Sequence, residues 1–458
     1  MITTTTTEKA LKLNLESKCY GTFAEIGAGQ EVANAFFKAG GASGTIAKTL
    51  SAYDMKISDS YYGVTKRYVS KERLLNMLDF EYDRLVYNLS DTSNEKLFFS
   101  LASTIETINF SKTNQGQGWM GVKFQTDHSK EPNYCIIHFL MNDQDVSLQQ
   151  ELTGILGVNL LYGLYHFADE MTIVKHLCDN LQLDRLEVNY IEFLGKDFSH
   201  VDNRKMALEL VNLGLSKMAL FNSEKKILQP VNALYKSDVI IQRGRFRPPT
   251  KVNQDLFNQG VKHLIEEKNI SPTNLHQIAE ITLHNLKGSD DKASINDFLF
   301  RADLLCELGY NVLITDFTYH QELTDYINKC LKVNSLSLVM GKPSFEDIFN
   351  EGLSSKYDLL STISSMTKGK NQLLIYPTQG QTSTNDFDKL SVDQDELKLI
   401  QYLISKAKIS YLNTSDEDLL KIDAGKVYEM IKNTDECWES FVPNEIKVKI
   451  KESSHLLS

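Results

Sequence analysis

The spacing of hydrophobic residues changes along the chain, and these changes predict an ordered series of helices and strands. Apolar residues recur at helical spacing in EVANAFFKA (31–39), in residues 70–89 and in two stretches between 147 and 180. Between 97 and 141 the period shortens to about two, in three runs separated by turn residues. The first half of the chain therefore predicts helices around three antiparallel strands.

Beyond residue 186 the pattern alternates between short apolar runs and helical spacing. Continuous apolar runs of this length are typical of parallel strands that are buried on both faces. Strands are expected at 186–193, 218–221, 238–242, 311–315, 336–340 and 372–376. Helices are expected at 206–213, 254–267, 274–286, 298–308, 322–330, 345–351, 359–366 and 419–432, with a polar loop at 378–394.

Together these patterns predict an α/β protein with an α+β N-terminal part. A small antiparallel sheet with helices would be followed by a Rossmann-like, mostly parallel sheet flanked by helices. A chain of 458 residues exceeds one ordinary core, so several domains are expected. We place a helical and antiparallel-strand domain at 1–147, a Rossmann-like domain at 148–395 and a helical cap at 396–458.

Composition narrows the functional classes. The net charge of -11 argues against a general nucleic-acid binder, which needs a broad basic face. The six cysteines form no C-x-x-C pair and have no histidines at metal-ligand spacing, so we expect reduced thiols, a cytoplasmic location and no metal site. The N-terminus lacks the features of a secretory signal, and no membrane association is expected. The apolar run 152–168 predicts a buried helix, whose glycines would let a second helix approach closely.

A glycine-rich segment, residues 23–54, predicts close approach of the backbone to a helix, a subunit or a ligand. Its Gly27-Ala28-Gly29 resembles the first loop of a methyltransferase or half of a dinucleotide fingerprint. The preceding YGTFAEI makes a poor strand, no βαβ unit is expected around it, and residues 45–52 are expected to form a second short helix. Gly27 and Gly29, with Lys48 nearby, are candidate ligand-binding residues; close helix packing is the alternative.

The sharpest chemical signal is QRGRFRPP (242–249), in which Arg243, Arg245 and Arg247 follow a predicted strand. Guanidinium groups suit phosphate or carboxylate, and open α/β sheets bind ligands at the carboxyl ends of their strands. The arginines could instead pair with acidic residues at an interface, or simply be solvated.

Two further strand ends carry polar residues. Asp316 follows the strand NVLIT, where it could bind a ligand or cap the next helix, and Tyr319 and His320 come just after it. Gly341-Lys342-Pro343-Ser344 ends the following strand and opens a helix, so it is another candidate anion site, although it lacks the spacing of a P-loop. No H-E-x-x-H, G-x-S-x-G or comparable catalytic set is present, so the sequence assigns no catalytic residue and no cofactor.

Five segments carry a resemblance to a poorly characterised bacterial family. They are 20–55, 67–83, 118–125, 242–250 and 301–317, and the similarity extends over nearly the whole chain. Members of that family are labelled nicotinate-nucleotide adenylyltransferase or, inconsistently, TonB-dependent receptor. The receptor label conflicts with the lack of a signal peptide and of a long run of alternating strands. The adenylyltransferase label implies nucleotides and a Rossmann-like sheet, but no His-x-Gly-His signature is present to carry over.

Two functions follow from these observations. The first is a cytoplasmic protein whose C-terminal sheet binds a nucleotide or another phosphorylated small molecule, in the manner of a nucleotidyltransferase. In it Arg243, Arg245 and Arg247 would hold the anion and Asp316 would be the nearest acid. The second is a non-catalytic, self-assembling homo-oligomer whose glycine-rich helices and arginine loop form subunit contacts.

Overall fold

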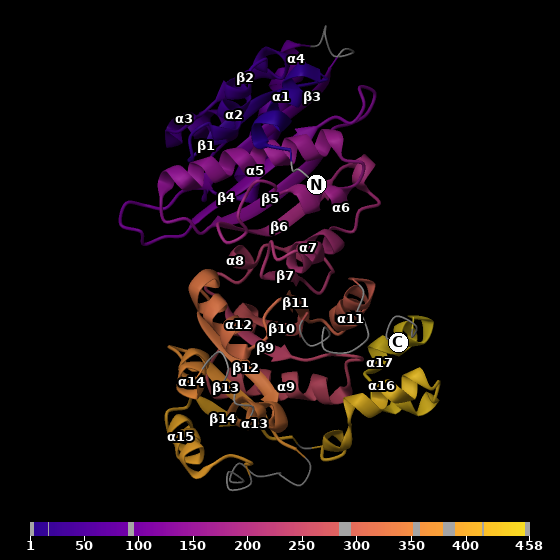
Figure 1. The fold of residues 1–458 in the computed structure, drawn as a ribbon. Coiled ribbons are helices and arrows are strands. Elements are labelled where there is room, and N and C mark those ends of the chain that lie inside the picture. The colour runs from indigo at the N-terminus through magenta and orange to yellow at the C-terminus, as the bar shows by residue number, and fades with distance from the viewer. Residues whose placement is uncertain are drawn as a thin grey trace. The chain divides into compact units, whose positions relative to one another are not determined.

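The chain divides into two compact units, Met1–Lys217 and Met218–Ser458. The structure, a computed structural model, describes residues 4–16, 18–89, 96–283, 295–350, 358–378, 390–414 and 416–453. Most of the loop expected at 378–394 lies outside these residues. Figure 1 shows the elements of both units, and each unit is described by itself.

The first unit is a six-stranded sheet with helices on both faces. Its helices are α1 (Thr6–Glu16), α2 (Glu31–Ala39), α3 (Met55–Tyr62), α4 (Lys71–Asn88), α5 (Val146–His166), α6 (Glu170–His176) and α7 (Asn203–Asn212). Its strands are β1 (Cys19–Ile26), β2 (Ile46–Leu50), β3 (Leu97–Glu106), β4 (Gly116–Phe124), β5 (Asn133–Met141) and β6 (Leu186–Leu194). Their order across the sheet is β2-β1-β3-β4-β5-β6.

The three expected antiparallel strands are confirmed as β3, β4 and β5, and β6 extends them antiparallel to β5. Helices α1, α2 and α5 share one hydrophobic core with one face of the sheet, while α4 packs on the strands from the other side. Ser70 caps α4 as expected, accepting a hydrogen bond from the backbone N–H of Arg73 at 3.2 Å. Hydrophobic spacing therefore located this layer correctly.

Two expectations about the glycine-rich segment are wrong. YGTFAEI is β1, a strand buried inside the sheet, and residues 46–50 form β2 instead of a helix. Both β2 and β3 pair with β1 in parallel, so β1-α2-β2 is a βαβ unit that the sequence had not predicted. Polar or small residues such as Glu25 are accommodated in this strand because other parts of the fold supply their contacts. The local sequence pattern does not reveal those contacts.

The close helix approach predicted from the glycines of 152–168 is confirmed. A Cβ atom on Gly157 of α5 would lie 2.3 Å from a Val32 methyl group of α2, and one on Gly154 would lie 3.0 Å from the Glu31 carbonyl oxygen. Gly29 and Gly40 differ, because they adopt φ values of +79° and +87° and no atom would lie closer than 3.5 Å. Backbone conformation, not crowding, is what favours glycine at those two positions.

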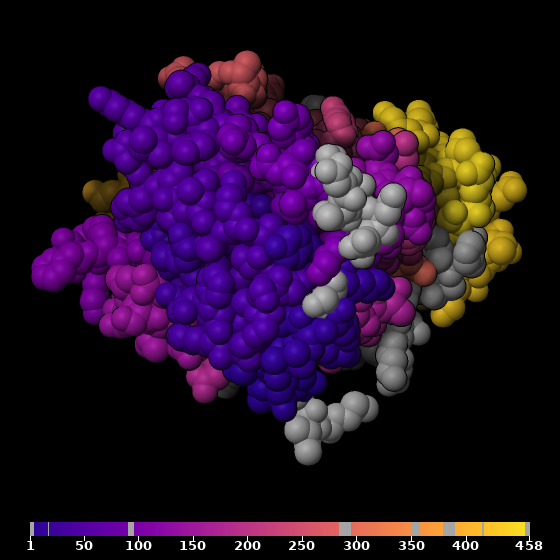
Figure 2. Space-filling model, turned by 90° about the horizontal axis from the view of Figure 1, so that it is seen from above, coloured from indigo at the N-terminus to yellow at the C-terminus, as the bar shows by residue number. Residues whose placement is uncertain are grey.

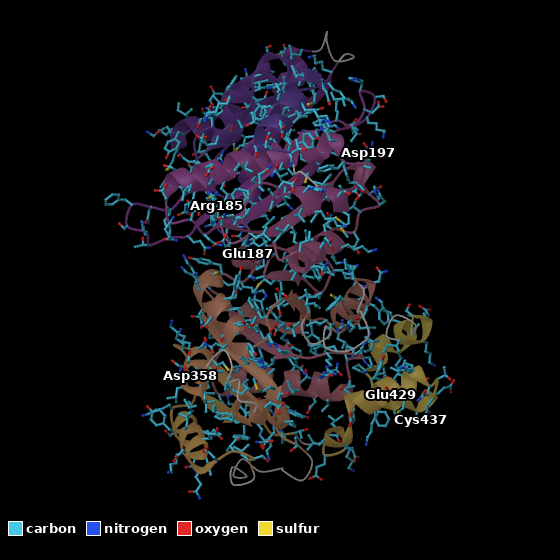
Figure 3. The ribbon with its side chains drawn as sticks, viewed as in Figure 1. Arg185, Glu187, Asp197, Asp358, Glu429 and Cys437 are labelled. Carbon is cyan, nitrogen blue, oxygen red and sulfur yellow. The ribbon has the colours of Figure 1, made fainter. Side chains whose placement is uncertain are left out.

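The boundary of the first unit follows from contacts of its last elements. Helices α5 and α6 and strand β6 belong to the first sheet's core, whereas we had expected residues from 148 onward to join the Rossmann-like domain. Glu187 on β6, labelled in Figure 3, accepts a hydrogen bond from the Lys217 backbone N–H at 2.9 Å. Figure 2 shows the indigo residues near the N-terminus forming one face of this unit.

The second unit contains an eight-stranded sheet. Its strands are β7 (Met218–Phe221), β8 (Ile227–Leu228), β9 (Asp238–Arg243), β10 (Leu275–Thr282), β11 (Asn311–Thr315), β12 (Ser335–Gly341), β13 (Gln372–Tyr376) and β14 (Ile409–Tyr411). Its helices are α8 (Pro230–Ala233), α9 (Lys251–Glu266), α11 (Ile295–Glu307), α12 (His320–Tyr326), α13 (Lys342–Asn350), α14 (Leu359–Met366), α15 (Gln394–Ser405), α16 (Ala424–Lys432) and α17 (Asn444–Ser453).

Six neighbouring strands of this sheet pair in parallel in the order β14-β13-β12-β9-β10-β11; at one edge β7 is antiparallel to β11, and β8 is antiparallel to β7. Taken in chain order, this is the 3-2-1-4-5-6 arrangement of a doubly wound Rossmann sheet. The expected Rossmann-like, mostly parallel sheet is confirmed. The helix expected at 274–286 is wrong: within the described residues it is β10, in which Ile278 and Ile281 lie in the middle of the sheet.

The sheet of the second unit is covered on both faces. Helix α9 lies on one face, where Gly260 sits against Ile240, Val339 and Leu374. Helices α12, α13, α14 and α15 share a core with the opposite face. Near the C-terminus α16 and α17 pack on α11 in a small core of their own.

All six cysteines are free thiols, and four of them are buried. Cys437, labelled in Figure 3, is exposed. Within the described ranges, no helix combines the length and the apolar character needed to cross a membrane.

Candidate functional site

The doubly wound sheet has one point where the chain changes direction. β9 is the first parallel strand of the unit, and β10 and β12 lie on either side of it. The chain leaving β9 enters α9 on one face, whereas the chain leaving β12 enters α13 on the other. Because the two segments diverge, a crevice opens at the carboxyl ends of β9 and β12, which is where such sheets bind ligands.

A cavity of about 240 Å³ occupies this crevice. Its walls come from the ends of three strands and from the starts of two helices. The lining residues are Ile241, Arg243, Gly244, Arg245, Glu280, His320, Leu323, Leu338, Val339, Met340 and Ser344. The floor is thus apolar, the exposed Arg245 and Ser344 sit at the rim, and the buried Glu280 belongs to a wall.

Arg243, the last residue of β9, is held by its neighbours. Its Nε and Nη2 donate to the two carboxylate oxygens of Glu280 at 2.8 Å each, and its Nη1 donates to the Thr318 carbonyl oxygen at 3.0 Å. Glu280 is completely buried and also accepts from the Thr315 hydroxyl at 2.7 Å. Arg243 therefore contributes structure and positive potential to the cavity, while three of its five N–H donors are already used.

Arg245 differs from the two arginines that flank it. Its side chain is exposed, lines the cavity and makes no ion pair or side-chain hydrogen bond with any residue that the structure describes. Its backbone carbonyl oxygen accepts a hydrogen bond from the buried Arg301 at 3.0 Å, which fixes the loop. The guanidinium of Arg245 is therefore available to a ligand.

Arg247 contacts side chains that hold the loop in place. Its Nη2 lies 3.4 Å from Asp297 of α11, and its guanidinium lies over the ring of Tyr428 at 5.4 Å. Asp297 also accepts from Arg301 at 2.6 Å, and burial lowers the pKa of Arg301 to about 10. One buried carboxylate thus anchors two arginines beneath the loop that presents Arg245.

His320 contributes an unused acceptor or donor to the cavity. Its Nδ1 is shielded from solvent and has no hydrogen-bond partner in the described part of the chain. Burial lowers the pKa of this imidazole well below its usual value, and the nearby positive charge of Arg243 lowers it further. The ring is consequently neutral at physiological pH, and its Nδ1 can exchange a hydrogen bond with a bound molecule.

The start of α13 forms the other side of the rim. Ser344 is exposed and lines the cavity, and the first N–H groups of a helix have no partner inside that helix. Lys342 at the same end is buried and lies 3.6 Å from Glu346. Asp316 lies beyond the end of β11 and does not line the cavity; α12 is capped at Tyr319, so Asp316 is not its N-cap.

The remaining candidates lie in the first unit. Gly27 follows β1 with a φ of +105°, and a Cβ atom there would lie 1.8 Å from the Ile105 carbonyl oxygen of β3. The carboxylate of Glu25 accepts from the backbone N–H groups of Val32 and Ala33 at 3.0 and 2.9 Å. These are N-terminal amides of α2, the groups that would otherwise bind an anion near Gly27 and Gly29.

Lys48, on β2, forms an ion pair with Glu81 of α4, and Glu81 also accepts from the Tyr62 hydroxyl at 2.9 Å. Lys48 therefore has a partner within the protein. The seven candidate residues fall in two units, and the structure brings Arg243 and Arg245 together at one cavity.

Reasoning from the sequence missed several residues of this site. Glu280 was hidden because residues 274–286 were expected to be helical, although the β-branched residues of LHQIAEIT are typical of a strand. Asp297 and Arg301 form an i,i+4 charge pair on α11, but their contacts with the arginine loop could not be predicted locally, because that loop lies about 50 residues earlier in the chain. His320 had been noted only as a residue that follows a strand, whereas Ser344 had been noted as part of a possible anion site at the start of a helix.

No family model matches this chain. No curated protein matches it either. The comparison with solved structures finds distant likenesses.

One similar structure is competence/damage inducible protein CihA from Agrobacterium tumefaciens, with 16% identity over 35% of this chain and 94% of that one, at a TM-score of 0.26. A CinA superfamily protein from Klebsiella pneumoniae has 14% identity over 36% and 99%, at a TM-score of 0.27. Plasmodium falciparum nicotinic acid mononucleotide adenylyltransferase complexed with NaAD has 12% identity over 48% and 97%, at a TM-score of 0.30. At these scores the likenesses carry no argument about the function of this chain.

Proposed function

We propose that the second unit binds a nucleotide or another phosphorylated small molecule at the carboxyl ends of β9 and β12. The observation that carries this proposal is the cavity at the switch point of the parallel sheet, with the exposed guanidinium of Arg245 at its rim. A planar guanidinium binds phosphate oxygens through two parallel hydrogen bonds, so a single free arginine suffices to orient such a group.

Other groups at the cavity fit the two ends of such a ligand. The N-terminal N–H groups of α13 and the hydroxyl of Ser344 would face phosphate oxygens, because a helix N-terminus carries partial positive charge. The apolar floor of Ile241, Leu338 and Met340 would cover a less polar part of the molecule. The neutral His320 would supply one directional hydrogen bond.

The role of each arginine follows from its contacts. Arg243 and Arg247 hold Glu280 and Asp297, so removing all three arginines at once would damage the loop as well as the ligand contact. Replacement of Arg245 alone separates the two effects. This proposal rests on the geometry of the second unit and concerns binding; no residue of the cavity is assigned a catalytic role.

The test is thermal unfolding of the full chain with AMP, ADP, ATP and NAD⁺, followed by calorimetry with any nucleotide that stabilises it. A ligand at one hundred times its Kd stabilises the folded state by about 2.7 kcal/mol. We expect Arg245→Ala to weaken binding at least tenfold, and His320→Phe to weaken it for ligands that use the imidazole.

The matched control is Arg84→Ala, which removes the same charge from an exposed arginine of the first unit. This variant is expected to bind as the wild type does. Equal affinity in the Arg245→Ala variant and the wild type would overturn the assignment of this cavity.

A further inference from the structure

A second cavity lies at the opposite, amino-terminal edge of the same sheet. Its volume is about 430 Å³, and it is formed where β9, β12 and β13 begin and where the chain enters β14. The lining residues are Asp238, Lys268, Asn269, Ile270, Ser271, Asn334, Ser335, Lys370, Asn371, Gln372, Lys406, Ala407 and Lys408. None of these residues lines the first cavity, so the two are separate.

Four of the lining residues are lysines, contributed by three different segments of the chain. None of the four forms an ion pair with a carboxylate anywhere in the described ranges. Lys370 donates to the Asn334 amide oxygen at 3.0 Å, and Lys408 donates to the carbonyl oxygens of Gly369 and Asn371. Lys268 makes no hydrogen bond within the described chain, and the ammonium of Lys406 lies over the Tyr402 ring at 5.5 Å.

Asp238 is the one acidic residue among the described residues that line this cavity, and its oxygens are already used. It accepts from Asn334 at 2.6 Å, from Ser335 at 2.5 Å and from Asn274 at 3.2 Å. Because Asp238 is buried at the start of β9, these contacts hold its carboxylate among neutral donors rather than near an ammonium. Within the described residues, Asp238 therefore forms no ion pair with any of the four lysines.

The C-termini of two helices offset part of the positive charge of the four lysines, but not all of it. α9 ends at Glu266 and α15 ends at Ser405, so both helices direct their partly negative C-termini toward the cavity. Each C-terminus carries about half a negative charge. With Asp238, they compensate about two of the four ammonium charges, which leaves an excess of about two positive charges. In a protein with a net charge of -11, such an excess of positive charge is a local feature of this cavity.

From these charges we infer that this cavity binds a small anion that carries two or more phosphate groups. Four ammonium groups that line one cavity from three segments match a chain of phosphates better than one isolated phosphate, because each can meet a different phosphate group. The side-chain amides and hydroxyls of Asn269 and Ser271 are exposed beside Lys268 and can complete the hydrogen bonding. The ammonium groups of Lys268 and Lys406, which form no hydrogen bond with a described residue, would be the principal contacts.

The probe for this site is inorganic tripolyphosphate, titrated into the full chain by calorimetry at low ionic strength. The titration uses Arg245→Ala as its background, so that binding at the first cavity is weakened, and the lysine substitutions added to it change the second cavity alone. We expect one saturable binding event, and we expect orthophosphate to bind at least tenfold more weakly. Adding Lys268→Ala and Lys406→Ala to that background should lower the affinity for tripolyphosphate at least tenfold.

The control variant removes the same charge elsewhere in the unit. Lys226 and Lys398 are both 72% exposed and lie outside the cavity, so Lys226→Ala with Lys398→Ala should leave the affinity unchanged. Absence of saturable binding, or an equal loss in the control variant, would overturn the site. Competition by ADP would identify a nucleotide as the source of the phosphates, and failure of ADP to compete would identify a free polyphosphate. Since Arg245 is absent throughout, this result is independent of the function proposed for the first cavity.

Discussion

Arg243 and Glu280 face each other across the neighbouring parallel strands β9 and β10, joined by two hydrogen bonds of 2.8 Å. The pair closes one wall of the candidate site, and Glu280 has no exposure to solvent. Its carboxylate would have no cation beside it if the arginine were removed. Such a pair fixes the geometry of its surroundings, because breaking it leaves a buried charge without a partner.

We therefore expect Arg243→Ala to destabilise the second unit by about 3–5 kcal/mol, measured by urea unfolding. Arg243→Lys should fall between that variant and the wild type, because it keeps the charge but cannot form the two-bonded contact. Exposed Arg84→Ala should change the free energy of unfolding by no more than about 0.5 kcal/mol. A loss in Arg243→Ala that matches this control would show that the pair does not support the fold.

The packing of α2 on α5 leads to a second prediction. Gly157→Ala should destabilise the first unit by about 1–3 kcal/mol, since the new methyl group would overlap the side chain of Val32. Gly163→Ala is the matched control on the same helix, because its Cβ would lie 3.3 Å from an Ile173 methyl group. Thermal unfolding should rank Gly157→Ala clearly below Gly163→Ala, and the reverse order would refute the close packing.

Glu25 makes the stability of the first unit depend on pH. Burial raises the pKa of this carboxyl from an ordinary value of 4.5 to about 7. The two hydrogen bonds from backbone N–H groups lower the pKa, but burial has the larger effect. Between those two pH values the folded state keeps a proton that the unfolded state has lost. The contribution of Glu25 to the free energy of unfolding must therefore fall as the pH rises from about 4.5 to 7, by up to about 3 kcal/mol, and this contribution stays constant above that range.

The measurement compares urea unfolding of the wild type and of Glu25→Gln at pH 5 and pH 8. The variant should lose less stability between the two pH values, because its side chain does not titrate. Glu72→Gln, at an exposed position in the first turn of α4, should keep the pH dependence of the wild type. Identical pH profiles for Glu25→Gln and the wild type would show that Glu25 is not protonated in the folded state.

We expect Asp297 to stabilise the conformation of the loop that carries Arg245. Asp297→Asn would leave the buried Arg301 and its neighbour Arg247 without their shared carboxylate. We expect faster hydrogen exchange across 244–250 and a loss of stability of about 3–5 kcal/mol. Hydrogen exchange is measured by mass spectrometry, with β13 as the internal control whose exchange should not change. If exchange in the loop is also unchanged, other contacts hold the loop.

Local patterns in the sequence were sufficient for most elements of this protein. Helical spacing located α2, α4, α5 and α9, and short apolar runs located β9, β11, β12 and β13, because these elements bury faces whose period depends on backbone geometry alone. The same runs predicted the parallel sheet, and the arginine loop was placed correctly at the end of a strand. Glycine spacing also predicted the close approach to α5.

Tertiary structure alone decided the rest. Mixed patterns occur in residues 20–26, 46–50 and 275–282. These segments form strands because neighbouring strands supply hydrogen bonds and apolar contacts that no local stretch of sequence contains. The strand order that opens the crevice, and the carboxylates that occupy Arg243 and Arg247 but leave Arg245 free, depend on contacts between distant parts of the chain. A sequence pattern shows which side chains can carry chemistry, and only packing determines which of them remain available to a ligand.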